Sequence, residues 1–318
     1  MNLPMPLPRF LSHLSLGVAL LAATAACRKP SSKPDPRKGL TATTLLQMGE
    51  AEVKVGRMDD GRRYLRTIEE QLPFTPEYPR AKVLLADSYF FAASPSYPEA
   101  LVEYQSFLNI FPRHELRDYA LYRVALCHYA SIETAERDQA ETRTAFEGFQ
   151  HLLRESPGSV YTSESKAKIV QCWRRLAEHE LVVGIFYVNT FHFAGAEKRL
   201  KELLETYPEY VDRERAYFYL GEAMRQRLLV DEDLTQFNKD YAAKLGKEDL
   251  KDLTREQVGQ YGKDFRAFSE AQIKGYRAEA KSYYQKLVES YPGSEWARRA
   301  ADRLITMGTS GVKEELDS

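Results

Sequence analysis

The sequence predicts an all-α protein, a right-handed α-solenoid of about five antiparallel helix pairs with an insertion in the last pair. Two observations predict this fold: five prolines each end a similar helical pattern, and a second helical pattern follows each of them. The prolines are Pro73, Pro112, Pro157, Pro208 and Pro292. Proline ends a helix because it lacks an amide hydrogen and clashes with the preceding turn. A recurring pattern is typical of solenoids, in which each repeat buries its apolar face against its neighbours.

The helix before each proline carries one small and two large apolar residues on one face. Counting back from the last four prolines, the twelfth residue is small, and the eighth and fourth are large and apolar. These positions hold Ala100, Tyr104 and Leu108; Ala145, Phe149 and Leu153; Ala196, Leu200 and Leu204; and Ala280, Tyr284 and Val288. Steps of four residues follow one face of a helix. The pattern before Pro73 fits more loosely, with Gly61, Leu65 and Ile68, the last of which is five residues before the proline.

The helix after each proline begins with a small residue eight positions on and an apolar residue twelve positions on. The small residues are Ala81, Ala120, Ser165, Ala216 and Ala300, and the apolar ones are Leu85, Val124, Ile169, Leu220 and Leu304. Small residues in both helices predict that the two approach closely. Successive prolines are 39, 45, 51 and 84 residues apart, against about 34 in a tetratricopeptide (TPR) array. The units are therefore TPR-like, with lengthened helices or turns.

Residues 1–26 are predicted to be a lipoprotein signal peptide. Arg9 provides a positive flank, and the apolar run from Phe10 to Ala23 is too short to span a bilayer comfortably. The following Thr24 to Cys27 resembles a bacterial lipobox, although leucine is usual where Thr24 stands. Lipidation of Cys27 would tether the protein to a membrane without a spanning helix. An ordinary secretory signal with an incidental cysteine is the alternative.

The rest of the chain divides by composition. Residues 27–42 contain the lipidated Cys27 and a Pro-rich, polar linker, and residues 43–308 form the TPR-like solenoid. Residues 231–272 are a charged insertion, which accounts for the spacing of 84 residues; we expect one amphipathic helix followed by a charged helix or loop. The insertion is either a solvated excursion or a partner site. Residues 309–318 are expected to be a disordered tail.

The composition argues against several functions. The formal net charge of -1 gives no global attraction to nucleic acid. Cys127 and Cys172 occupy equivalent positions of neighbouring repeats, so we expect buried thiols rather than a disulfide. The six histidines form no metal-spaced pair, and there is no phosphate-binding loop or nucleophile elbow. The sequence therefore predicts no catalysis, no metal and no cofactor.

The chain resembles the BamD (YfiO-like) family of outer-membrane lipoproteins, which belong to the barrel assembly machinery. The resemblance runs from roughly Thr43 to Arg227 and is most specific between Gln139 and Pro208. The segments that carry it are Ala145–Phe149, Pro157–Tyr161, Arg175–Glu180 leading to Phe186-Tyr187, and Ala196–Leu200, with Pro73–Tyr78 matching the turn after the first repeat. The insertion departs from the family pattern and puts C-terminal partner contacts in doubt.

The resemblance implies a non-enzymatic scaffold, lipid-anchored at the periplasmic face of the outer membrane. Such a scaffold binds the barrel-forming subunit BamA and recognises unfolded outer-membrane proteins. One alternative is another periplasmic TPR lipoprotein, such as a cell-envelope or division coordinator. The alternative from another class is an accessory subunit of an envelope enzyme.

A concave groove in the first three repeats is predicted to bind an extended client segment that bears an aromatic residue. Positions nine, sixteen and seventeen after a proline are expected to face this inner surface. They hold Lys82, Tyr89 and Phe90; Leu121, His128 and Tyr129; and Lys166, Trp173 and Arg174. Aromatic side chains among cations suit a peptide that ends in an aromatic residue and a carboxylate, which the resemblance suggests as client signal. The alternative is that Tyr89 and Trp173 pack against the neighbouring repeat.

Overall fold

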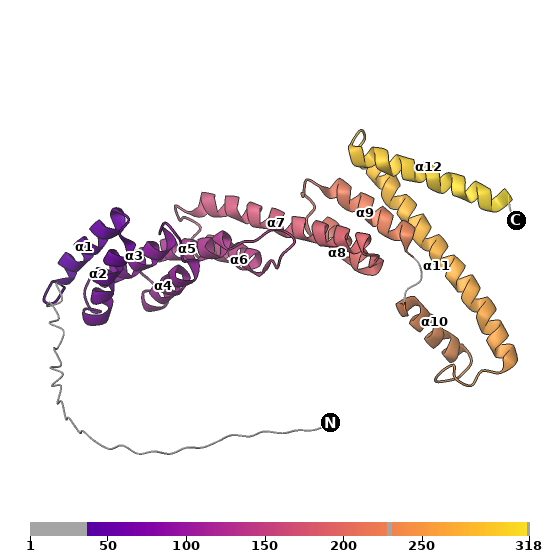
Figure 1. Cartoon of the computed structure of the whole chain (residues 1–318), viewed down its shortest axis with the longest axis horizontal. Helices are drawn as coiled ribbons and strands as arrows, with labels where there is room; N and C mark the ends of the chain where they lie inside the picture. Colours follow the sequence, from indigo (N-terminus) through magenta and orange to yellow (C-terminus); the bar gives the residue numbers. More distant parts are fainter. Residues whose placement is uncertain (1–36, 228–230, 317–318) are drawn as a thin grey trace, which may run out of the picture. The chain divides into compact units, whose positions relative to one another are not determined.

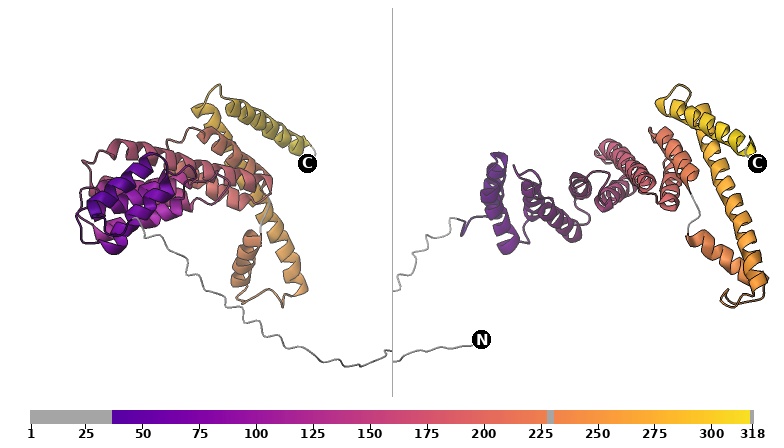
Figure 2. Two further views of the ribbon diagram at one scale, coloured as in Figure 1. Left: turned by 60° about the vertical axis from the view of Figure 1, so that its left-hand side comes forward. Right: turned by 45° about the vertical axis from the view of Figure 1, so that its right-hand side comes forward.

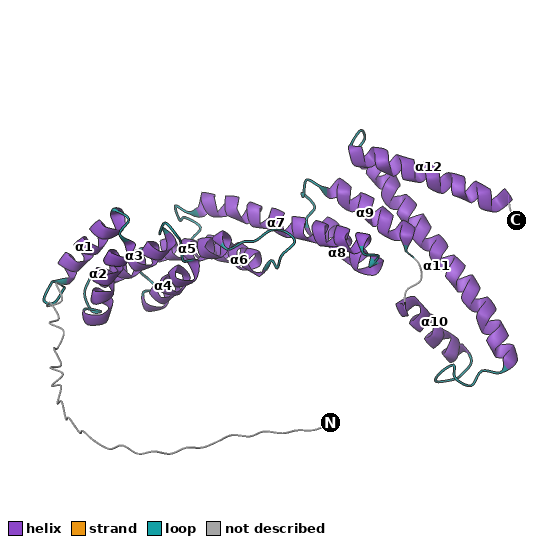
Figure 3. Ribbon diagram, in the orientation of Figure 1, coloured by secondary structure: helices purple, strands orange, loops and turns teal. Residues whose placement is uncertain are grey.

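The computed structural model describes residues 37–227 and 231–316 (Figure 1). The predicted signal peptide and Cys27 lie outside the described residues. From Thr41 onward, the described residues form helices and connecting turns but no strand (Figure 3). The predicted all-α class is confirmed.

Ten of the described helices form five antiparallel pairs, and each pair packs against the next one along the chain (Figure 2). The pairs are α1 (Ala42–Lys54) with α2 (Met58–Gln71), α3 (Tyr78–Phe90) with α4 (Tyr97–Ile110), α5 (Arg117–Ala130) with α6 (Ala140–Glu155), α7 (Thr162–Asn189) with α8 (Phe193–Thr206), and α9 (Arg213–Gln226) with α11 (Arg255–Ser290). We call the members of each pair the first and second helix of a repeat. A final helix, α12 (Glu295–Leu316), packs against α11 and α9. It continues to Leu316, through the region in which the sequence predicts a disordered tail.

The buried stripe of each second helix lies twelve, eight and five residues before the proline. These positions hold Gly61, Leu65 and Ile68; Ala100, Tyr104 and Phe107; Ala145, Phe149 and Leu152; Ala196, Leu200 and Leu203; and Ala280, Tyr284 and Leu287, all of them buried. The fourth position before the proline, predicted to belong to the stripe, is only half-buried. The physical reason is that seven residues make almost two helical turns, whereas eight overshoot by most of a right angle. The pattern before Pro73, which fits the predicted stripe loosely, is therefore the general one.

Small residues let the helices of a repeat approach closely, as predicted. The residues eight positions after each proline are all buried. In the fourth repeat, a Cβ added to Gly184 would lie 2.6 Å from Cγ of Leu200 in the partner helix. In the fifth, a Cβ on Gly221 would overlap the ring of Tyr284. Any larger side chain at these glycines would force the two helices apart.

The two cysteines of the solenoid are free and buried, as predicted. Burial raises the pKa of Cys127 to about 12 and that of Cys172 to about 11. Since the thiolate is the reactive form, neither side chain is a nucleophile at neutral pH.

The insertion is a helical hairpin with its own aromatic cluster. Its first arm is α10 (Asp231–Lys244), and its second arm is the N-terminal part of α11, which continues without a break into the fifth repeat. The ring of Phe237 lies 4.8 Å from that of Phe268 and 5.3 Å from that of Phe265. An amphipathic helix followed by a charged helix is therefore what the insertion contains, but its predicted end at residue 272 falls inside α11.

Removing residues 231–272 and joining the ends with a short Gly/Ser segment is expected to leave the repeats folded. The buried residues of α11, Ala280, Tyr284 and Leu287, all lie beyond the deleted segment. The deletion removes the hydrogen bond from Tyr276 to Asp233, which is 3.0 Å long and partly buried. Thermal unfolding followed by circular dichroism should stay cooperative, with a midpoint within about 4 °C of the parent. Loss of cooperative unfolding would show that the hairpin belongs to the core.

Candidate peptide-binding surface

The predicted groove residues do not line one surface, and Lys82 shows why. Its ammonium group lies 2.5 Å from Glu69 in α2 and 2.5 Å from Glu103 in α4, and the residue is only 4% exposed. Burial opposes the charge on Lys82, but the two carboxylates outweigh it and raise its pKa. The ninth position therefore faces the two second helices that flank α3, and Lys82 is an internal ion-pair partner. Its predicted place on an open inner surface is wrong.

Tyr89, at the sixteenth position, faces the same side and forms the floor of a pocket. The pocket has a volume of about 400 Å³ between α2 and α4, and its lining residues are Arg66, Tyr89, Pro98, Glu99, Val102 and Glu103. Arg66 donates a hydrogen bond of 2.8 Å to the hydroxyl of Tyr89, and the guanidinium of Arg62 lies 4.0 Å from the ring centroid. Val102 is 63% exposed and provides an apolar wall. A half-buried ring and an apolar wall suit an aromatic side chain, and Arg66, whose guanidinium also lies 3.5 Å from Glu103, is the cation beside it.

The residues at the seventeenth position turn the other way, toward the first helix of the next repeat. Phe90 packs edge-on against Tyr97, and its ring centroid lies 4.9 Å from the guanidinium of Arg123 in α5. Tyr129 donates to Gln171 of α7 over 2.5 Å. The sixteenth and seventeenth positions are adjacent in sequence and so differ by about 100° around the helix. The predicted groove is thus divided between two faces of the repeats.

The other predicted residues have local partners or lie exposed. His128 contacts Glu141 of its own repeat at 2.8 Å, and Leu121 packs against a buried cluster. The ring of Trp173 lies 5.1 Å from that of Tyr207, which follows the second helix of the same repeat. Lys166 and Arg174 are exposed on α7. Of the nine predicted residues, Tyr89 lines the pocket between α2 and α4.

Sequence reasoning missed a buried polar cluster that joins the second and third repeats. Asp87 accepts hydrogen bonds from Tyr104 and from Tyr119, the latter 2.6 Å long, and Arg123 lies 4.8 Å from the Tyr119 ring. Burial raises the pKa of Asp87 and outweighs these two hydrogen bonds. No signal in the sequence links Asp87 to Tyr119, because their pairing depends on how two repeats stack. The cluster serves the packing of the repeats.

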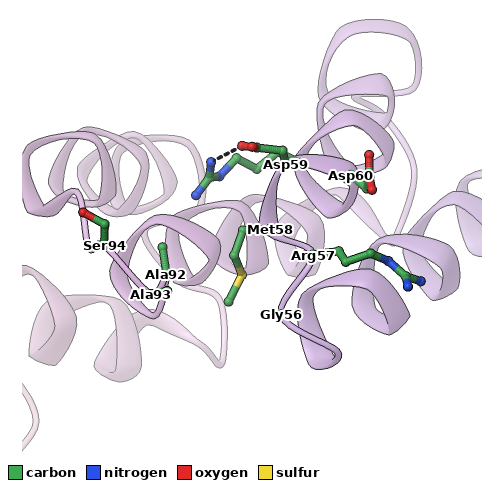
Figure 4. Close-up of a pocket in the computed structure, with 9 residues that line it drawn as sticks. Gly56, Arg57, Met58, Asp59, Asp60, Ala92, Ala93 and Ser94 are labelled. Carbon is green, nitrogen blue, oxygen red and sulfur yellow. Dashed lines mark hydrogen bonds and ion pairs between the residues drawn. The ribbon is translucent and has the colours of Figure 1, made fainter.

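A second pocket lies where the turns within the first and second repeats meet (Figure 4). Its volume is about 420 Å³, and its lining residues are Gly56, Arg57, Met58, Asp59, Asp60, Arg62, Ala92, Ala93 and Ser94. Arg62 lies 2.7 Å from Asp59, one turn earlier on α2, and also donates to Ser88 of α3. Since this pocket has no aromatic lining residue, it suits an aromatic ligand less well than the Tyr89 pocket.

Two further searches cover the described residues only. No described helix is both long and apolar enough to cross a membrane. Within the same residues, no group of histidine, cysteine and acidic side chains is arranged to hold a metal ion.

Comparisons with known proteins match most of the repeats. The family model YfiO, described as "Outer membrane lipoprotein", matches residues 39–239, and a tetratricopeptide repeat model matches residues 267–294. The chain is 26% identical to outer membrane protein assembly factor BamD of Caulobacter vibrioides over 65% of this chain and 67% of the relative. The protein of the same name from Haemophilus influenzae is 27% identical over 65% and 82%, and that from Vibrio cholerae 24% over 68% and 91%.

Proposed function

Because the chain belongs to the YfiO family of outer membrane lipoproteins, we propose that it is an outer-membrane protein assembly factor of the BamD type. The observation that carries this proposal is the family match over residues 39–239, which include the first four repeats and α9. The chain is associated with the outer membrane and is not an enzyme. The family match favours assembly over the two alternatives, a division coordinator and an accessory subunit of an envelope enzyme.

The proposed partners are a BamA-like barrel subunit and unfolded outer-membrane proteins. A scaffold of repeats suits this role because stacked helix pairs offer long surfaces on which an extended chain can lie. The Tyr89 pocket supports client binding, since it would take an aromatic side chain and place Arg66 near a carboxylate. Neither partner requires a cofactor or nucleic acid.

The proposed attachment to the membrane is through lipid on Cys27, at the periplasmic face. The family description supports it, as does the lipobox-like segment before Cys27. A lipid tether suits a chain whose described helices do not cross a membrane.

Replacing Val102 with aspartate is expected to weaken binding of an unfolded-client peptide at least about tenfold, because a third carboxylate would then join Glu99 and Glu103 in the lining and replace its apolar wall. The probe is a peptide that ends in an aromatic residue and a free carboxylate, and titration calorimetry measures its affinity. Tyr89→Ala should have a similar effect because it removes the aromatic floor. Val102 is mostly exposed, so Val102→Asp should fold normally.

Two controls make this test specific. Phe74→Ala removes an aromatic ring that is 99% exposed and outside the pocket, and it should leave the affinity unchanged. Amidation of the peptide carboxylate should weaken binding to the parent but not further weaken binding to Arg66→Gln. If folded Val102→Asp and Tyr89→Ala variants bind as tightly as the parent, the pocket is not the client site. Tyr129→Ala then tests the other face of the repeats, and Trp173→Ala tests the position of the fourth repeat that is equivalent to Tyr89.

A further inference from the structure

The turn between α7 and α8 exposes two phenylalanines. Phe186 is 59% exposed on the last turns of α7, and Phe191 is 73% exposed in the turn itself. The ring of Phe193, at the start of α8, lies 6.1 Å from that of Phe191. Exposed aromatic residues gathered in one short segment mark a contact surface more often than scattered single ones do.

Phe191 is held in an unfavourable backbone conformation. Its φ of 64° is the one positive value among the described residues other than glycine. The amide of Phe191 bonds to the carbonyl of Val188, and the amide of His192 to that of Tyr187. This helix ending normally has glycine at the left-handed position, as Gly56 with a φ of 81° provides after α1. Glycine would cost less here, so the folding of the isolated chain does not explain the phenylalanine.

The segment around this turn also lacks charge. From Leu181 to Ala196 there is no aspartate, glutamate, lysine or arginine, in a chain that is 29% charged. The corresponding turn of the first repeat contains Arg57, Asp59 and Asp60. An uncharged surface has no complementarity that would select a charged partner. Aromatic rings without nearby charge are instead suited to the interfacial region of a lipid bilayer.

We propose that the α7–α8 turn contacts the outer membrane, with Phe186 and Phe191 seated at the level of the lipid headgroups. Membership of a family of outer membrane lipoproteins places a bilayer close to this chain. The inference also rests on the proposed lipid anchor at Cys27.

Fluorescence quenching by brominated lipid tests the contact. The full lipidated chain is placed in vesicles of phosphatidylethanolamine and phosphatidylglycerol, with or without brominated acyl chains. We expect the emission added by Phe191→Trp to fall about twofold in the brominated vesicles, since interfacial rings lie within reach of acyl chains. The aromatic replacement keeps the ring and the backbone strain. Phe74→Trp, at a position that is even more exposed but follows α2, should not be quenched.

Each outcome decides the proposal. Quenching at position 191 alone supports it, and quenching at neither position or equally at both overturns it. A cross-link from a photoreactive residue at position 191 to a protein, together with unquenched emission, would assign the turn to a protein partner and also overturn it. The mass of the purified protein reports acylation of Cys27 separately. Failure of the anchor is therefore read from the mass, and failure of the membrane contact from the quenching.

A glycine at position 191 separates this function from stability. Phe191→Gly removes the strain and little buried area, so we expect its melting temperature to rise by about 2 °C. A second substitution, Phe186→Trp, reports the contact next to it. Brominated lipid should quench the fluorescence of this tryptophan less in the Phe191→Gly variant than in the chain that retains Phe191. Unchanged quenching of Phe186→Trp would show that Phe191 does not contact the bilayer.

Discussion

Replacing Tyr284 with alanine is expected to lower the free energy of unfolding of the C-terminal repeats by about 4 kcal/mol. Tyr284 is fully buried in α11, where its ring packs against that of Phe218 and against the backbone at Gly221. Truncation would leave a cavity between α9 and α11 that rigid helices cannot fill. Tyr284→Phe keeps the packing and removes one hydrogen bond, so it should cost only about 1 kcal/mol.

The hydroxyl of Tyr284 belongs to a cluster around Glu222. This buried carboxylate accepts hydrogen bonds of 2.7 Å from Tyr284 and Arg303, and of 2.8 Å from Arg225. Burial alone would raise the pKa of Glu222, but these hydrogen bonds outweigh it, and the pKa lies below the ordinary value of 4.5. The stabilisation is therefore complete above about pH 4.5 and is lost as the pH falls through the lowered pKa. Glu222→Gln should flatten this acid dependence.

Hydrogen exchange read by mass spectrometry locates these effects. Tyr284→Ala should speed exchange in α9, α11 and α12, and leave α3 and α4 as slow as in the parent, because each repeat depends mainly on its neighbours. The matched control is Tyr104→Ala, the equivalent position of the second repeat, which should speed exchange in α3 to α5. If both variants speed exchange equally along the whole chain, the repeats are not locally coupled.

Replacing Cys27 with alanine is expected to move nearly all of the protein from the membrane fraction to the soluble envelope fraction. Lipid on this residue is the proposed anchor, and no described helix can replace it. Mass spectrometry of the parent should find a lipidated peptide that begins at Cys27. Cys127→Ala removes a buried thiol instead and should leave the protein in the membrane fraction. An unmodified N-terminus at Cys27, or at any later residue, would contradict the anchor.

The repeats could be predicted from the sequence because small and large residues recur at fixed distances from proline. Ala100 and Tyr104 lie in the core for the same reason as Ala280 and Tyr284, namely that both pairs occupy one helical face. The sequence pattern places the third buried position one residue too late. The reason is that Leu108 and its equivalents are also apolar, although they are only half-buried. Because the fifth and the fourth positions before the proline are both mostly apolar, a single sequence does not show which of them is buried.

The binding surface could be predicted only in part. Tyr89 was found because aromatic residues recur near it in the repeat pattern. The sequence could not show that Lys82 is held between Glu69 and Glu103, because the two acids belong to helices of different repeats. Arg66 and Val102 were missed for the same reason.

The α7–α8 turn and the insertion depend on features that periodicity does not describe. A helix ending that takes glycine elsewhere carries Phe191 here, and only the backbone angle reveals the strain. The composition predicts that the insertion is a separate segment that ends at residue 272, whereas α11 continues through this residue as one helix. Because α11 continues through the change in composition, the sequence has no helix stop signal at that point that would show where the insertion ends.

Affinity purification of the tagged chain in mild detergent, from cells that produce it at its native level, tests the proposed function most directly. An unrelated outer-membrane lipoprotein with the same tag is the control. We expect mass spectrometry to find a BamA-like barrel protein in amounts comparable to the tagged chain and absent from the control. Recovery without any barrel protein, or with an envelope enzyme as the main partner, would contradict the assignment of this chain as an outer-membrane assembly factor.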